Sequence, residues 1–108
     1  MVCWAGDQDF NYRHAFVPFF GVQAATVGVM SDLGRRADAA VLAYGFQREA
    51  GGHYRLWIEP AWEPLPAAQD AARYMAWLER TVRRHPSQYM WVHRRFKTRP
   101  PGEPSLYR

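Results

Sequence analysis

The sequence has one cysteine, one lysine and no long apolar run, and these shortages exclude several classes of protein. Cys3 cannot form an internal disulfide or build a cysteine-rich zinc site. The longest weakly polar stretch, residues 15–30, contains proline and two glycines, whereas a membrane span needs about 20 mostly apolar residues. No cationic segment precedes an apolar one at the N-terminus, as a secretory signal requires. We therefore expect no disulfide scaffold, no transmembrane helix and no secretory signal.

The usual catalytic motifs are also missing. None of the four histidines is followed five residues later by Asp or Glu, and no H-E-x-x-H is present. The chain has no G-x-S-x-G, no G-x-x-x-x-G-K-[ST] and no G-x-G-x-x-G. Taken alone, the residues define no nucleophile–base pair, and we expect no metal and no cofactor.

What is present is enough apolar material for one small domain and an uneven distribution of charge. Of the 108 residues, 48% are hydrophobic and 16% aromatic, which is too rich for a disordered segment. The formal net charge of +4 divides into −3 over residues 1–79 and +7 over residues 80–108. All the cations except Lys97 are arginines, the side chain that grips carboxylates and phosphates with a planar fork.

The pattern along the first half of the chain predicts strands and one short helix. We expect strands over residues 2–5 and 39–46, the second buried on both faces because its apolar run is continuous. Residues 53–59 alternate and predict a half-buried strand antiparallel to 39–46, with Tyr54, Leu56 and Ile58 on one face. Residues 16–21 surround a proline and predict a loop or an edge strand. Ser31 is the expected N-cap of a helix over residues 31–37.

The second half predicts helices. Residues 67–84 carry an apolar stripe at helical spacing: Ala71, Met75, Leu78 and Val82. Ser87 is the expected cap of a short helix over residues 88–93, and residues 100–108 predict an extended, proline-rich tail. The fold class is therefore α/β, with a partial sheet and flanking helices.

Two groups of residues are candidates for binding chemistry. Asp7, Gln8 and Asp9 follow the first expected strand, and either orient a polar substrate or form an Asx-type turn. In the C-terminal segment, cations alternate with Tyr89, Trp91 and Phe96. Such a mixture stacks on nucleic-acid bases, surrounds an anion site or is simply a solvated face.

Residues 85–100, which read HPSQYMWVHRRFKTRP, resemble the C-terminal signature of the bacterial lipid A biosynthesis acyltransferases, the lauroyl and myristoyl transferases. The segments 7–10 (DQDF), 16–21 (FVPFFG) and 24–26 (AAT) resemble the middle section of that family in the same order. The resemblance implies that residues 1–99 are the C-terminal portion of a glycerolipid-acyltransferase-like fold, followed by a tail over 100–108.

The resemblance also implies a reaction and its partners. A histidine in an H-x-x-x-x-D/E motif would act as general base on a hydroxyl of a lipid A precursor, which attacks an acyl carrier protein thioester. This chain lacks that motif, so no catalytic residue is expected in it and the chain alone is expected to be inactive. The implied partners are acyl carrier protein as acyl donor, the lipid A precursor and the cytoplasmic face of the bacterial inner membrane, without nucleic acid.

By the same resemblance, site roles fall on nine residues. Substrate contacts are expected from Asp7, Gln8, Asp9, Arg94, Arg95 and Lys97, and an acyl pocket or membrane-facing rim from Phe16, Phe19 and Phe20. Two other functions stay open: a non-catalytic binding or assembly protein from a truncated gene, and a basic nucleic-acid-binding module.

Overall fold

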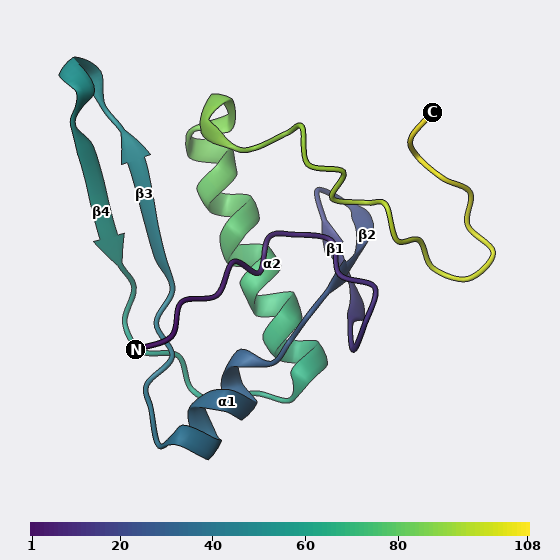
Figure 1. Ribbon diagram of the computed structural model, residues 1–108, viewed down its shortest axis with the longest axis horizontal. Helices are drawn as coiled ribbons and strands as arrows, with labels where there is room; N and C mark the ends of the chain where they lie inside the picture. The colour runs from purple at the N-terminus through teal and green to yellow at the C-terminus, as the bar shows by residue number, and fades with distance from the viewer.

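The computed structural model describes residues 1–108 and consists of two antiparallel hairpins and two α-helices (Figure 1). The first hairpin comprises β1 (Ala15–Phe19) and β2 (Val22–Thr26), and the second β3 (Tyr44–Arg48) and β4 (Tyr54–Ile58). The helices are α1 (Met30–Ala37) and α2 (Ala67–Arg84), with 3-10 turns η1 (Ala50–Gly52) and η2 (Pro86–Gln88). The α/β class is confirmed, although the strands form two separate sheets rather than one partial sheet. Neither helix combines the length and apolar character needed to span a membrane.

Helix α2 is the centre of the core. Its predicted bounds are confirmed, and the stripe Ala71, Met75, Leu78 and Val82 is buried. Val17 and Phe19 from β1 and Ala24 from β2 pack with this stripe in one hydrophobic cluster. The first hairpin and α2 therefore form the packed part of the molecule.

The turn between β1 and β2 explains why this hairpin forms. Phe20 and Gly21 both have positive φ angles, 51° and 77°, as a two-residue hairpin turn requires. Pro18 lies opposite Gln23 and is tolerated because each strand of a two-stranded sheet is an edge. The prediction of a loop or edge at residues 16–21 is thus confirmed.

The second hairpin corrects the predicted burial of its strands. Its antiparallel pairing is confirmed, with Tyr44 opposite Ile58 and Phe46 opposite Leu56. The prediction of a doubly covered strand over 39–46 is wrong, because β3 begins at Tyr44 and Phe46 is exposed. The predicted apolar face of β4 is exposed too. The side chain that packs inward is Trp57, whose indole lies against Gly45.

Three further local predictions are wrong. Residues 2–5 are exposed and make no hydrogen bond, because no neighbouring strand lies beside them to complete a ladder. Ser31 lies inside α1, where Val29 is the N-cap, and its hydroxyl accepts hydrogen bonds from the Leu65 amide and Arg73. The expected helix over residues 88–93 is absent: Gln88 ends η2, and residues 89–93 form bends and turns.

The C-terminal tail has no helix or strand but is anchored to the body. The Phe96 amide donates a hydrogen bond to the Tyr107 hydroxyl at 2.9 Å, and Arg99 pairs with Glu103. The tail therefore turns back instead of extending away.

Candidate functional site

The N-terminal acidic segment and the C-terminal basic segment meet in the folded chain. The Asp9 carboxylate accepts hydrogen bonds from the Thr98 amide at 3.1 Å and from the Thr98 hydroxyl at 2.8 Å. The Asp9 amide donates to His93 Nε2 at 2.8 Å. Two candidate groups that are more than 80 residues apart in sequence are therefore joined by three hydrogen bonds.

A polar cavity of about 620 Å³ opens at this junction. Its lining residues are Asp9, Phe10, Asn11, Val92, His93, Arg94, Lys97 and Thr98. Arg94 and Lys97 are exposed and form no ion pair in the chain. Because Nε2 of His93 accepts a backbone hydrogen bond, that nitrogen carries no proton in this arrangement. The cavity presents two cations without an ion pair, of which Arg94 also lies over the Tyr107 ring at 5.7 Å, and it is suited to an anionic group.

Asp7 points to a different cavity from Asp9. An apolar cavity of about 310 Å³ lies between the second hairpin and α2, within the size range of ligand pockets. It is lined by Ala5, Asp7, Tyr44, Gly45, Phe46, Gln47, Trp57, Tyr74, Trp77, Leu78, Thr81, Val82, His85, Gln88 and Tyr89. Two lining donors, the Tyr89 hydroxyl and Trp57 Nε1, are buried without a hydrogen-bond partner. A ligand oxygen in this cavity would satisfy them.

Two tyrosines of the apolar cavity are held in their neutral form. Burial raises the pKa of Tyr89 to about 12, and the charge of Asp7 contributes to the shift. Burial, with a smaller contribution from Asp7, likewise raises the pKa of Tyr74. Because both phenols keep their protons at neutral pH, both remain hydrogen-bond donors beside the Asp7 carboxylate.

Arg95 lies inside the molecule, whereas its neighbour Arg94 lies at the surface. Arg95 is 2% exposed, and its guanidinium donates to the Ala25 carbonyl at 2.7 Å and to the Thr26 hydroxyl at 2.5 Å. Burial lowers the pKa of Arg95. This geometry favours a structural role, in which Arg95 fastens the C-terminal segment to β2. Its contact with substrate stays a prediction.

The predicted phenylalanines do not line the apolar cavity. Phe19 is buried and its ring contacts those of Phe20, Tyr89 and Phe96. Phe16 is half-buried beside His14. The geometry therefore favours a role in the core for Phe19, and the acyl-pocket or membrane-rim role of the three stays a prediction. Gln8 is exposed and makes no side-chain hydrogen bond, so it is free to contact a substrate.

The aromatic residues of the C-terminal segment are used within the fold. Tyr89 and Phe96 pack against the hydrophobic cluster, and Trp91 lies beside Phe20 while donating to the Pro86 carbonyl. Tyr89 and Phe96 are therefore partly buried, whereas Trp91 remains 55% exposed. No group of three or more His, Cys, Asp or Glu side chains is arranged to hold a metal ion.

Some site residues had no signal in the sequence. The hydrogen bonds of Asp9 with His93 and Thr98 join residues 84 to 89 positions apart, so no local sequence pattern predicts them. Tyr74 belongs to α2, and periodicity alone does not separate it from residues of the core. Trp57 was expected on the polar side of its strand. Arg94 and Lys97, by contrast, belong to the basic segment that the charge distribution indicated.

A cation-lined cavity beside an apolar one is the kind of site that binds an amphiphilic anion. Comparison with known proteins gives the family: the profile described as bacterial lipid A biosynthesis acyltransferase matches residues 1–98. The chain therefore belongs to that family, which confirms the resemblance.

Three relatives show how much of such proteins the chain covers. It is 44% identical to the lipid A biosynthesis palmitoleoyltransferase of Escherichia coli (strain K12), over 98% of this chain and 36% of that protein. The lauroyltransferase of the same organism is 40% identical over 99% of the chain and 37% of its own length. The myristoyltransferase of the same organism is 34% identical over 94% of the chain and 33% of its own length. The chain thus spans about a third of the length of these relatives.

Proposed function

We propose that this chain supplies the C-terminal, substrate-binding part of an enzyme that transfers a fatty acyl chain from acyl carrier protein to a hydroxyl of a lipid A precursor. The observation that carries the proposal is the junction of Asp9 with His93 and Thr98, which places Arg94 and Lys97 around one cavity. Family membership supports the acyltransferase class. The printed names of the relatives support lipid A biosynthesis as the setting.

In this proposal the two cavities have complementary tasks. Arg94 and Lys97 hold an anionic group of the precursor, because charge-assisted hydrogen bonds to phosphate are strong. The apolar cavity takes part of an acyl chain, and the unpaired donors of Tyr89 and Trp57 meet an ester or thioester oxygen. Asp7, which lines the same cavity, orients a hydroxyl or amide group.

The general base is supplied by residues outside this chain. The sequence has no H-x-x-x-x-D/E, and the only histidine at the junction, His93, is committed to the Asp9 amide. The chain alone is therefore proposed to bind substrate without transferring an acyl group. The reaction is proposed to take place at the cytoplasmic face of the inner membrane, where acyl carrier protein and precursor meet.

A chimaera tests this proposal. The matching segment of the Escherichia coli palmitoleoyltransferase is replaced by this chain, and acyl transfer from acyl carrier protein to a lipid A precursor is measured. We expect activity, and we expect Arg94→Gln with Lys97→Gln to raise the KM for the precursor about tenfold, since two solvent-exposed ion pairs with the precursor are lost. The matched control is Arg48→Gln with Arg108→Gln, which removes two exposed charges elsewhere.

Two results would contradict the proposal. An unchanged KM in the Arg94/Lys97 variant would show that these cations do not bind the precursor. Turnover by the isolated chain would show that the general base lies within it. A chimaera without activity whose circular dichroism matches that of the parent enzyme would contradict the assignment of this segment to substrate binding.

A further inference from the structure

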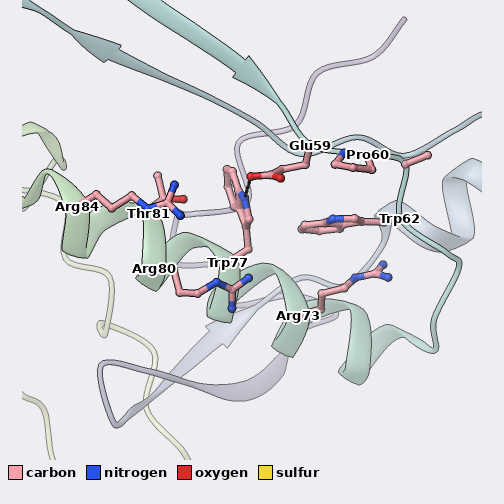
Figure 2. A pocket seen from close by; sticks show the side chains of 9 residues that line it. Glu59, Pro60, Trp62, Arg73, Trp77, Arg80, Thr81 and Arg84 are labelled. Carbon is pink, nitrogen blue, oxygen red and sulfur yellow. Dashed lines mark hydrogen bonds between the residues drawn. The ribbon is translucent and has the colours of Figure 1, made fainter.

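A third cavity, of about 460 Å³, lies between α2 and the segment that follows β4 (Figure 2). From α2 it is lined by Arg73, Trp77, Arg80, Thr81 and Arg84, and from the other wall by Glu59, Pro60, Ala61 and Trp62. Arg73, Trp77, Arg80 and Arg84 are spaced by three to four positions and share one face of the helix, with Thr81 beside Arg80. None of the three arginines lines either cavity of the candidate functional site.

The wall opposite α2 is fixed by main-chain hydrogen bonds. The Glu59 amide donates to the Ala43 carbonyl at 2.8 Å, and the Trp62 amide to the Val41 carbonyl at 2.9 Å. Trp62 and Trp77 meet edge to face at 6.2 Å between ring centroids. The cavity is therefore built from elements that hold its shape without a ligand.

The arginines of this cavity differ in whether they have a partner within the chain. The Arg73 guanidinium lies over the Trp62 ring at 4.6 Å, at one end of the cavity (Figure 2). It also donates a hydrogen bond to Asp70. Arg80 and Arg84 are exposed, and their side chains make neither an ion pair nor a hydrogen bond. Because they lie four positions apart on one helix, their charges repel each other. An anion between them would remove that repulsion.

The one acid of the lining is already engaged. Glu59 Oε1 accepts a hydrogen bond from Trp77 Nε1 at 3.1 Å, drawn as the dashed line in Figure 2. With three arginines and one glutamate, the lining carries a net charge of +2. A cleft of one sign with low-dielectric indole walls concentrates ions of the opposite sign.

We propose that this cavity is a second anion site, which binds the phosphate group of a phosphate ester. Arg80 and Arg84 each direct a planar fork of donors toward the phosphate oxygens, and the organic part of the ester packs on the indoles of Trp62 and Trp77. Such a phosphate belongs either to a lipid headgroup or to a soluble ester. This inference does not depend on acyl transfer, since it uses no residue of the precursor cavity.

The test measures binding of this chain to two phosphate sources. The soluble arm titrates glycerol 3-phosphate by calorimetry. The lipid arm floats the chain with vesicles of phosphatidylcholine and phosphatidic acid, against vesicles of phosphatidylcholine alone. All variants carry Arg94→Gln and Lys97→Gln as background, so that the precursor cavity does not contribute.

We expect binding in at least one arm, and a loss of about tenfold with Arg80→Gln and Arg84→Gln, the size that two solvent-exposed ion pairs predict. Arg80→Lys with Arg84→Lys, which keeps the charge but not the fork, should retain part of the affinity. The matched control Arg48→Gln with Arg108→Gln should bind as the background does. Both pairs are exposed, so circular dichroism should be unchanged in every variant.

The arms separate the sources of phosphate. Binding of vesicles alone assigns the site to a lipid headgroup, and binding of glycerol 3-phosphate alone assigns it to a soluble ester. No binding in either arm overturns the proposal. An equal loss in the Arg80/Arg84 and Arg48/Arg108 pairs also overturns it, because attraction would then follow total charge instead of this cavity.

Discussion

The two hairpins have the same local architecture and opposite surroundings. In the first, Val17, Phe19 and Ala24 are buried against α2. Arg95 donates a hydrogen bond to the backbone of this hairpin, and Glu79 accepts one from it. In the second, all the large side chains on one face are exposed: Tyr44, Phe46, Tyr54, Leu56 and Ile58. In Figure 1 it stands away from the first hairpin, on the other side of α2. The comparison shows that strand pairing and burial are separate properties of this chain.

The second hairpin is held mainly at its ends and through one indole. Gln88 exchanges two hydrogen bonds with the backbone of Arg48, at 2.8 and 2.9 Å. Trp57 packs against Gly45, and Glu59 is tied to Ala43. Its other face is a contiguous apolar surface, of the kind that marks interaction sites. Most of the stability of the chain should therefore come from the first hairpin and α2.

A pair of leucines gives the largest contrast between the two regions. Leu78 of α2 is 8% exposed and Leu56 of β4 is 61% exposed. We expect Leu78→Ala to lower the free energy of unfolding by about 3 kcal/mol, because it leaves a cavity in the core. Leu56→Ala should change it by less than about 0.5 kcal/mol. Urea denaturation followed by circular dichroism measures both. Equal losses would mean that the exposed face of the hairpin is covered in solution.

Arg94 and Arg95 give the next largest contrast, because they are adjacent in sequence and differ in burial. Arg95→Ala removes donors from the Ala25 carbonyl and the Thr26 hydroxyl inside the core. We expect a loss of about 2 kcal/mol, the range for buried groups left without a partner. Arg94→Ala should lie within about 0.5 kcal/mol of the parent. If denaturation midpoints show Arg94→Ala to be the more damaging change, the assignment of a structural role to Arg95 is wrong.

The comparison of hairpins also indicates what the sequence was able to predict. The bounds of α2 and the antiparallel pairing of β3 with β4 were predicted correctly, because the pattern that indicates them lies within short stretches of sequence. The burial of β3 depends on what packs over it, and the alternation of Tyr54, Leu56 and Ile58 is the same whether that face is covered or exposed. Residues 2–5 have strand character but no neighbouring strand to pair with.

The candidate site divides in the same way. The sequence shows an excess of cations after residue 80 and leaves open whether they surround an anion site or form a solvated face, and Arg94 and Lys97 line a cavity. Sequence alone does not distinguish Arg94 from Arg95, since only the tertiary fold turns one outward and the other toward Thr26. The contact of Asp9 with Thr98 joins residues near the two ends of the chain, and local sequence patterns do not predict contacts over such a separation.

The smallest expected effect concerns Glu79, which pairs with Arg83 within α2 and accepts a hydrogen bond from the Phe20 amide of the first hairpin. Glu79 accepts hydrogen bonds from Arg83 and from the Phe20 amide, and these lower its pKa below the ordinary value of 4.5. A carboxyl whose pKa is lowered by folding stabilises the folded state above its unfolded pKa, and loses that contribution as pH falls through the folded value. We expect Glu79→Gln to lower the stability at pH 7 by less than about 1 kcal/mol, since the pair is partly exposed.

The pH dependence separates this pair from general charge effects. The difference in unfolding free energy between the parent and Glu79→Gln should shrink as the pH is lowered from 5 to 3, because the parent carboxyl then becomes protonated. Glu63→Gln is the control, since Glu63 is exposed and its carboxylate makes no ion pair. A difference that stays constant over this range would show that the Phe20 and Arg83 contacts do not depend on the charge of Glu79.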